Sequence, residues 1–179
     1  MEYLRREVYF GQEAINLFAD EGNLRDRALR GAIEGKIRHF FECIDEENWK
    51  EITRHLASDA KLLARLLDPS DIYSGIQSIV ARLKNEVASG QKTVHKLLIV
   101  DRGRVTCYVA QFWMHQNMRS TFFESREVYV IDIDDRHQFK RIEIRDHDRE
   151  RMQHDGDEEM MKKAVKRAEM DAMRLIDRI

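Results

Sequence analysis

The sequence has few cysteines, no long apolar stretch and little net charge, and each of these absences excludes a class of protein. Cys43 and Cys107 are the only cysteines, too few for a disulfide framework and without the paired spacing of a zinc site. No apolar stretch approaches the ~20 residues that span a bilayer, and the N-terminus lacks the apolar core of a secretion signal. Lys and Arg number 31 against 33 Asp and Glu, without the basic excess of a nucleic-acid binder. We therefore predict a soluble, cytoplasmic protein that binds neither nucleic acid nor membrane.

The first half of the chain predicts helices. Apolar residues recur at helical spacing from Leu24 to Ile44, which indicates a long amphipathic helix. Asn48 can cap a second, short helix at Trp49 to Leu56 by accepting a bond from a free backbone N–H. Residues 59–66 fit either a short strand or a helix.

A third helix and a series of strands follow. Ser74 to Gln77 has the pattern of a capping box, and an apolar stripe continues from Ile76 to Val87 before Gly90. The period then changes to alternation in four runs, Thr93–Val100, Val105–His115, Thr121–Ile133 and Phe139–Arg145. Short polar connections join several of these runs and predict an antiparallel meander. We therefore predict an α+β domain in which three N-terminal helices pack on a curved antiparallel sheet.

The C-terminal part reads as a charged linker and an extra amphipathic helix. Its apolar positions are Met161, Val165, Ala168, Ala172, Leu175 and Ile179. This spacing fits either a coiled-coil seam or a helix docked along one stripe, and so short a helix is marginal alone in water. We predict an N-terminal extension (1–23), a domain (24–148) and this appendage (149–179).

Because both faces of the run Val105–His115 are apolar, we expect one face to be covered by a terminal helix or a partner subunit, and we predict a homo-oligomer, a dimer or trimer.

Three residues in the middle of the chain suggest proton-transfer chemistry. Asp45 follows the long helix, His95 lies in the first β-run and His115 ends the second. An acid and two imidazoles on segments that wrap one cavity could act as acids and bases on a small molecule. The alternatives are two structural histidines and an exposed aspartate in a helix–helix turn. The odd-numbered face of the second β-run, mostly apolar with Gln111 and His115 as polar points, resembles the wall of a ligand pocket.

The order of elements between Leu24 and Asp148 resembles the NTF2-like superfamily, also called the SnoaL-like or cone-shaped α+β fold. Within it, the pattern resembles scytalone dehydratase and similar SnoaL-like dehydratases. The matching residues are Asp45 before Asn48-Trp49, Thr93-Val94-His95, and Tyr108 seven residues before His115. In that family, two histidines and an aspartate hold a water and carry out syn-elimination, so the resemblance implies these catalytic roles for His95, His115 and Asp45.

The substrate site departs from the family's pattern. The asparagine that helps to grip the substrate falls at Arg126, and a tyrosine of the first strand falls near Ala64. A guanidinium suits an anionic ligand, although an ordinary ion pair between Arg126 and Glu124 is the alternative. The predicted substrate-binding residues are Arg126, Tyr108, Trp113, Gln111 and Phe41.

Two functions remain open at this stage. The first is a cofactor-independent lyase or isomerase, dehydratase-like, that acts on a small hydrophobic and in some cases anionic substrate by His/Asp acid–base catalysis. The second is a non-catalytic module of the same fold that binds a ligand or oligomerises. We predict no cofactor. We also predict no metal ion, because the stretch Asp146 to Asp148, with His154-Asp155 downstream, is rich in arginine and lacks a fixed spacing of metal ligands.

Overall fold

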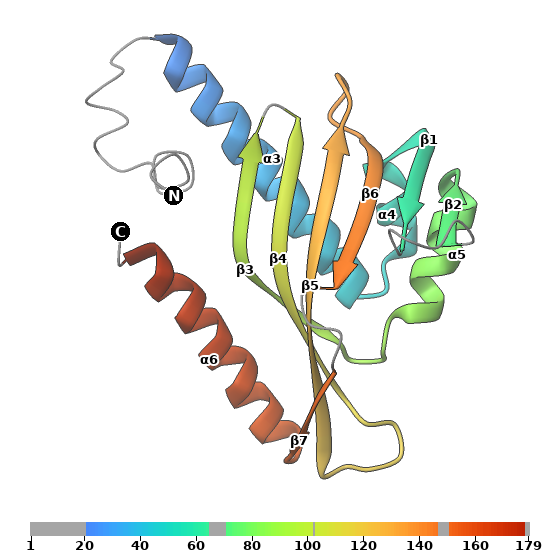
Figure 1. The fold of residues 1–179 in the computed structure, drawn as a ribbon, viewed down its shortest axis with the longest axis vertical. Helices are drawn as coiled ribbons and strands as arrows, with labels where there is room; N and C mark the ends of the chain where they lie inside the picture. The colour runs from blue at the N-terminus through green and yellow to red at the C-terminus, as the bar shows by residue number, and fades with distance from the viewer. Residues whose placement is uncertain (1–20, 65–70, 102, 147–150, 178–179) are drawn as a thin grey trace.

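The computed structural model describes residues 21–64, 71–101, 103–146 and 151–177 (Figure 1). The helices in these ranges are α3 (Glu21–Asp45), α4 (Trp49–His55), α5 (Ile76–Glu86) and α6 (Glu158–Asp177). The strands are β1 (Leu56–Leu63), β2 (Ile72–Ser74), β3 (Lys92–Asp101), β4 (Arg104–Met114), β5 (Thr121–Ile133), β6 (Phe139–Asp146) and β7 (Met152–Asp155). Among the described residues, none of the helices has both the length and the apolarity needed to cross a membrane.

The strands form one curved sheet in the order β2-β1-β6-β5-β4-β3, with β7 on β5 (Figure 1). The predicted meander is confirmed, because β3, β4, β5 and β6 pair antiparallel in sequence. The prediction of a purely antiparallel sheet is wrong, since β1 pairs parallel with β6. This pairing joins the chain after α4 to the last strand of the meander and closes one side of the cone.

Two local predictions are resolved by hydrogen bonding. The segment that fitted either strand or helix is β1, which begins at Leu56 and pairs on both edges. The predicted capping box is wrong: Ser74 ends β2, and α5 begins after Gly75, which makes no side-chain cap. Gly75 has a φ of 82°, a left-handed value that glycine adopts without steric cost, so the turn into α5 depends on backbone freedom instead of a serine hydroxyl.

The inner side of the sheet is filled by α3. Ile37, Phe40 and Phe41 have no exposed surface, and Phe40 meets Phe139 of β6 edge-to-face at 5.0 Å between ring centroids. Full burial of such a side chain stabilises the fold by about 2 to 3 kcal/mol. The apolar stripe seen in the sequence is therefore the stripe that packs against the sheet.

Strand β4 is covered by one helix on each face. Val105, Cys107 and Val109 belong to the core beneath α3, whereas Ala110 and Phe112 belong to a second core beneath α6. Side chains of a strand alternate between the faces of a sheet, so the odd-numbered residues of β4 point into the cone. The doubly apolar run in the sequence is explained by two helices of the same chain.

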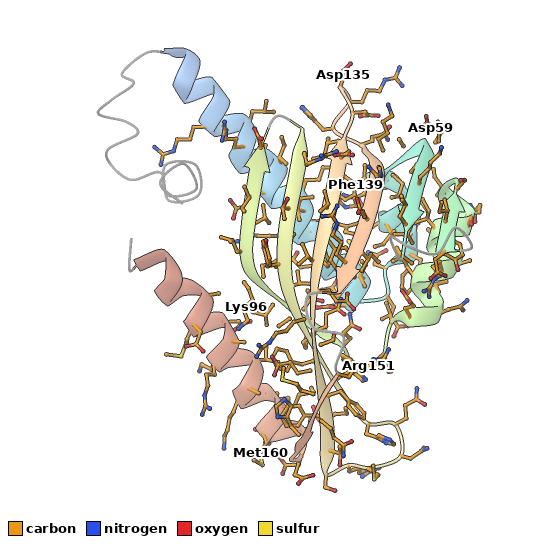
Figure 2. The ribbon with its side chains drawn as sticks, in the orientation of Figure 1. Asp59, Lys96, Asp135, Phe139, Arg151 and Met160 are labelled. Carbon is orange, nitrogen blue, oxygen red and sulfur yellow. The ribbon has the colours of Figure 1, made fainter. Side chains whose placement is uncertain are left out.

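A β-bulge divides β3. The pairing with β4 shifts between His95 and Leu97, which leaves Lys96 out of register (Figure 2 labels Lys96). Val94 before the bulge packs with the outer core, but Leu98 after it packs with the inner core. A bulge of one residue exchanges the two faces of a strand, so the bulge allows β3 to present His95 and Leu98 to the same side.

The terminal helix docks along its predicted seam. Met161, Ala168 and Ala172 are buried, and Val165 packs at the margin of the same cluster on β3 and β4. The side chain of Leu175, and Ile179, lie outside the described residues. The docked-stripe alternative thus applies to α6 within one chain.

The stretch expected as a charged linker contains the short strand β7, which pairs with β5. His154 of β7 contacts Glu124 at 3.1 Å and stacks on Phe122 at 4.9 Å between ring centroids. Gly156 follows, where a Cβ would lie 2.9 Å from the Cβ of Met160 and 3.1 Å from Cε1 of Phe122. The glycine therefore permits the close approach that turns the chain from β7 into α6.

Replacing Ala168 by Glu should detach α6 from the sheet. The substitution places a charge among the apolar side chains of the outer core. We expect a loss of about 2 to 4 kcal/mol in the free energy of unfolding. Urea unfolding and limited proteolysis of α6 measure the effect. The exposed Lys166→Glu is the matched control; an equal loss in both variants would contradict the docked arrangement.

Candidate functional site

A cavity of about 520 Å³ opens between α5 and the inner face of β4 and β5. Its apolar lining consists mainly of Ile44, Leu83, Val87, Trp113 and Ile144. Its polar lining includes Arg82, Glu86, Gln91, Gln111, Ser125, Arg126, Glu127, Tyr129 and Arg151. Arg151 lies at the start of β7 (Figure 2). The volume suits a small organic ligand, but the wall is much more polar than the predicted hydrophobic cavity.

A chain of hydrogen bonds runs along the cavity wall. Ser125 donates to Gln111 at 3.4 Å, the Gln111 amide donates to the Tyr129 hydroxyl at 3.5 Å, and Tyr129 donates to Glu127 at 2.9 Å. Burial, assisted by the Glu127 charge, raises the pKa of Tyr129 well above its usual value. The Tyr129 hydroxyl therefore stays protonated and donates its hydrogen bond to the Glu127 carboxylate.

Three arginines give the cavity its cationic character. Arg82 pairs with Glu86, yet its Nε is buried and has no hydrogen-bond partner among the described residues. Arg126 pairs with Glu124 at 3.1 Å, within one strand instead of across two, and the Arg151 guanidinium lies 5.6 Å from the Trp113 ring centroid. A buried N–H without an acceptor costs about 1 to 3 kcal/mol, and the charge of the Arg82 guanidinium in the cavity wall favours an anionic ligand group.

His95 lies on the inner face of the sheet but does not line the cavity. Its ring meets Phe41 edge-to-face at 5.1 Å, and its Nδ1 is 3.4 Å from the sulfur of Cys107. Burial, with a smaller effect of the Arg38 charge, lowers the pKa of His95 to about 4. The imidazole is therefore neutral near pH 7. Cys107 is buried, and burial raises the pKa of its thiol to about 12.

Asp45 is an anchor between secondary-structure elements. Its carboxylate accepts bonds from the backbone N–H of Thr93 at 2.6 Å, from the Thr93 hydroxyl at 2.7 Å and from the Gln91 amide at 3.5 Å. Burial raises the pKa of Asp45 and these bonds oppose the shift. The alternative of a solvated turn residue does not describe this half-buried side chain, which ties the end of α3 to the start of β3.

His115 does not meet the other two residues. It follows the last residue of β4, accepts a bond from the N–H of Asn117 at 3.0 Å and packs on Phe123. His95 pairs with Val109, so His115 lies six residues further along β4, about 20 Å at the usual rise of a strand. The structure therefore brings Asp45 near the strand of His95 and leaves His115 at the far hairpin.

The predicted substrate-binding residues divide into two groups. Gln111, Trp113 and Arg126 line the cavity, whereas Tyr108 and Phe41 do not. Tyr108 lies on the even-numbered face of β4, and Phe41 packs edge-to-face on Tyr129 at 4.9 Å between centroids.

The sequence reasoning missed Glu127, Tyr129 and Arg82. For Glu127 and Tyr129 the signal was their odd-numbered position, shared with Ser125. Odd-numbered residues of this strand pair with the odd-numbered residues of β4 and extend its pocket-like face. Arg82 had no comparable signal, because its place depends on how α5 packs.

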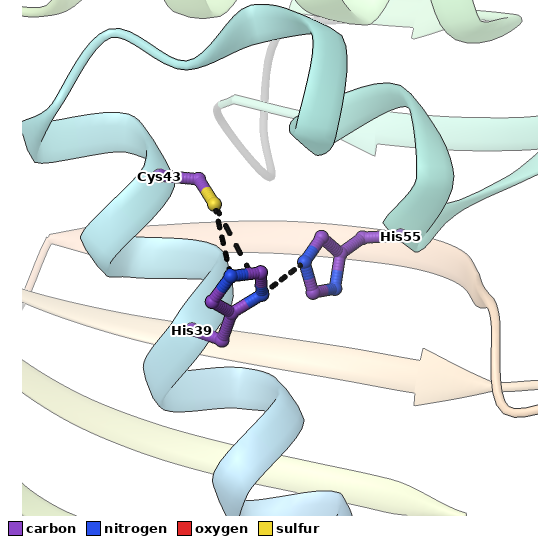
Figure 3. Close-up of side chains that lie close together, drawn as sticks. All are labelled: His39, Cys43 and His55. Carbon is purple, nitrogen blue, oxygen red and sulfur yellow. Dashed lines mark hydrogen bonds between the residues drawn. The ribbon is translucent and has the colours of Figure 1, made fainter.

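Side chains of the kinds that bind metal ions meet elsewhere, where α4 packs on α3. His39 and Cys43 lie one turn apart on α3 and His55 ends α4; we call these three residues the helix cluster (Figure 3). Burial, followed by the Lys36 charge, lowers the pKa of His55 to about 4. Of the stretch previously weighed as a metal site, His147 and Asp148 lie outside the described residues.

Solved structures share this fold. A candidate ketosteroid isomerase from Kribbella flavida matches with a TM-score of 0.50 and 15% identity over 63% of this chain and 75% of that chain. An epoxide hydrolase/cyclase-like enzyme of pyran ring formation in salinomycin matches with a TM-score of 0.56 and 11% identity, over 64% and 90% of the two chains. A Mycobacterium tuberculosis protein in complex with estradiol-17beta-hemisuccinate matches with a TM-score of 0.52 and 8% identity, over 61% and 88%.

These likenesses establish the fold alone. The predicted NTF2-like cone is confirmed at that level, and the closer likeness to scytalone dehydratase stays a prediction. No family model matches the sequence, and no curated protein is significantly similar to it.

Replacing Asp45 by Ala should destabilise the junction of α3 and β3. The variant leaves the Thr93 N–H without its acceptor, and we expect a loss of about 1 to 3 kcal/mol in the free energy of unfolding. The exposed neighbour Glu46→Ala should change the free energy by less than about 0.5 kcal/mol. Chemical denaturation compares them, and similar values for both would show that the anchor contributes nothing.

Stability should fall as the pH falls through the weakly acidic range. The pKa of His95 is depressed from 6.5 to about 4 in the folded state, so the unfolded chain binds more protons between these values. Lowering the pH from about 7.5 to about 5 should therefore cost about 2 kcal/mol through His95 alone, with His55 adding to the slope. Denaturation of wild type and His95→Phe at both pH values measures it; an unchanged slope in the variant would refute the assignment.

Proposed function

We propose that the protein binds a small organic anion in the cavity and moves a proton on it, with Glu127 as the base and Tyr129 as the hydrogen-bond donor. The observation that carries the proposal is the half-buried Tyr129–Glu127 bond of 2.9 Å in the cavity wall, in which the tyrosine is buried. Solvent exclusion strengthens such a bond and fixes the positions of both groups before a ligand arrives.

The two groups fit complementary roles. A carboxylate can take a proton from a carbon acid, and the Tyr129 hydroxyl, which stays protonated, can then donate to the negative charge that develops on a neighbouring oxygen. Gln111 supports the hydroxyl on its other side. Proton removal and return is the step shared by isomerisation, dehydration and cyclisation, so the proposal is a lyase or isomerase of small molecules.

The ligand should combine an apolar body with a negative group. Trp113, Ile44 and Leu83 offer apolar contact, and the Arg82 guanidinium offers positive charge to an anion. One of the solved neighbours is a complex with a steroid hemisuccinate, and this combination of ring system and carboxylate supports the choice of probe.

A dehydratase-like mechanism with His95, His115 and Asp45 is the second candidate. The neutral ring of His95 lies behind Phe41, which also contacts Tyr129. In this mechanism Phe41 would have to swing aside, and His115 would have to act from another part of the cone. A module that binds a ligand without turnover is the third outcome that the experiment below recognises.

Calorimetry with estradiol-17beta-hemisuccinate and uncharged estradiol tests the binding site. We expect the charged probe to bind at least about tenfold more tightly, because an ionic hydrogen bond adds about 1.5 to 3 kcal/mol. Arg82→Gln should remove this preference, while the matched Arg104→Gln, at the start of β4 and outside the cavity lining, should keep it. Equal affinities for both probes in wild type would contradict an anion site.

The same proteins test the chemistry. Isomerisation of a β,γ-unsaturated steroid ketone that carries a hemisuccinate group can be followed by the absorbance of its conjugated form, and Glu127→Gln should lower the rate about 10²- to 10⁴-fold. His95→Ala should retain most of the rate. The reverse pattern would favour the histidine mechanism, and binding without turnover would leave a binding module.

A further inference from the structure

The helix cluster has the geometry of an incomplete metal site. Nδ1 of His39 lies 3.0 Å from Nε2 of His55, and the sulfur of Cys43 lies 4.0 Å from this Nδ1 and 3.6 Å from Nε2 of the same ring (Figure 3). One ligand atom from each of the three residues lies within 4.8 Å of the others. Three soft or borderline donors therefore face one point between two helices.

These separations are close to those of a tetrahedral zinc site. Zn–N bonds of about 2.0–2.1 Å and Zn–S bonds of about 2.3 Å imply N···N distances of about 3.3 Å and N···S distances of about 3.6 Å. His39 is exposed, so its ring can reorient about its side-chain torsions toward an ion. The exposed ring also gives an ion a path from solvent.

The charges around the cluster favour a cation. Glu51 lies one helical turn before His55 on α4. The Glu51 charge raises the pKa of both Cys43 and His55. Further carboxylates at Glu42 and Glu46 act on Cys43. The opposing cations are Lys36, which bonds the His137 carbonyl, and Arg54, which binds Glu51 at 2.8 Å. Glu51 therefore adds negative charge near the cluster and would have to exchange its bond to Arg54 to become a fourth ligand.

His55 is a buried imidazole of which only one nitrogen, Nε2, has a hydrogen-bond partner among the described residues. Its ring is 5% exposed between Phe40 and Phe139, and its Nδ1 has no partner among the described residues. Such a buried polar atom costs about 1 to 3 kcal/mol, and an apolar ring would fill the space without that cost. Only Nε2 of this costly buried ring, which contacts His39, is therefore available to an ion.

We propose that His39, Cys43 and His55 bind a Zn²⁺ ion that links α4 to α3, with Glu51 or a water as the fourth ligand. His39 contributes Nδ1, His55 contributes Nε2, and Cys43 contributes its sulfur as a thiolate, releasing its proton on binding. The site is separate from the cavity, and the proposal does not depend on the function proposed above.

Cobalt(II) gives a direct readout of the ligands. The full chain, freed of any affinity tag and treated with a chelator, is titrated with Co²⁺ and then with competing Zn²⁺. We expect one ion per chain, a thiolate-to-cobalt charge-transfer band and its loss when zinc displaces cobalt. At about 100 times the dissociation constant, zinc should also raise the Tm by roughly 5–10 °C.

Variants assign the ligands. Loss of a supporting partner alone lowers metal affinity about 10- to 100-fold, so His39→Ala and Cys43→Ala should each lower it more than about 100-fold, and Cys43→Ala should abolish the charge-transfer band. The exposed position of His39 keeps its variant folded. Cys107→Ala, the other buried cysteine, is the control and should retain both. Absence of the band in wild type, or an affinity unaffected by Cys43→Ala and His39→Ala, would overturn the proposal.

Discussion

The packing of Phe41 between Tyr129 and His95 decides which polar groups of the cone can reach a ligand. Phe41 is fully buried and touches both rings edge-to-face. The Tyr129 hydroxyl is left on the cavity side with Glu127, while His95 is held beside Cys107. Protein interiors are close-packed, so displacing a buried phenyl ring costs several kcal/mol. The resting arrangement therefore separates the tyrosine–glutamate pair from the histidine.

Strand β4 can be apolar on both faces because the chain covers both of them. The inner face packs beneath α3 and the outer face beneath α6, whose seam includes the small residues Ala168 and Ala172. An apolar outer face was one reason to expect a partner subunit, and α6 now accounts for it within one chain. The predicted homo-oligomer therefore needs support from another surface, such as the exposed Met160 and Met170 of α6.

Local periodicity was sufficient to predict most of the fold. The meander and the long helix follow from alternation and from the 3.6-residue stripe, and β5 has the predicted bounds Thr121–Ile133. Features that depend on distant pairing were missed: β1 joins β6 in parallel, and β7 pairs with the start of β5. The charged composition around β7 hides a strand whose stability comes from the contacts of His154 with Glu124 and Phe122.

The candidate site shows the same limit more sharply. Parity placed Gln111 and Trp113 on the cavity wall, because alternation is a local property of a strand. The convergence of His95 with His115 is a long-range property, and no sequence pattern gives the separation of two residues along paired strands. The helix cluster escaped notice for a related reason, since an i, i+4 pair on α3 becomes a site only when the packing of α4 adds His55.

Both proposed sites share α3, and this links their behaviour. Phe41 faces the sheet, while His39 and Cys43 face α4 one turn away on the same helix. Helix α4 runs directly into β1, and β1 pairs with β6, so an ion between α3 and α4 would fix the helix to one wall of the cone. Such an ion touches no ligand, and it can alter ligand affinity only as far as it changes the freedom of Phe41 and Tyr129. Couplings of this kind are typically about 5- to 150-fold and reciprocal, so any effect of zinc on ligand affinity must be matched by an equal effect of the ligand on zinc affinity.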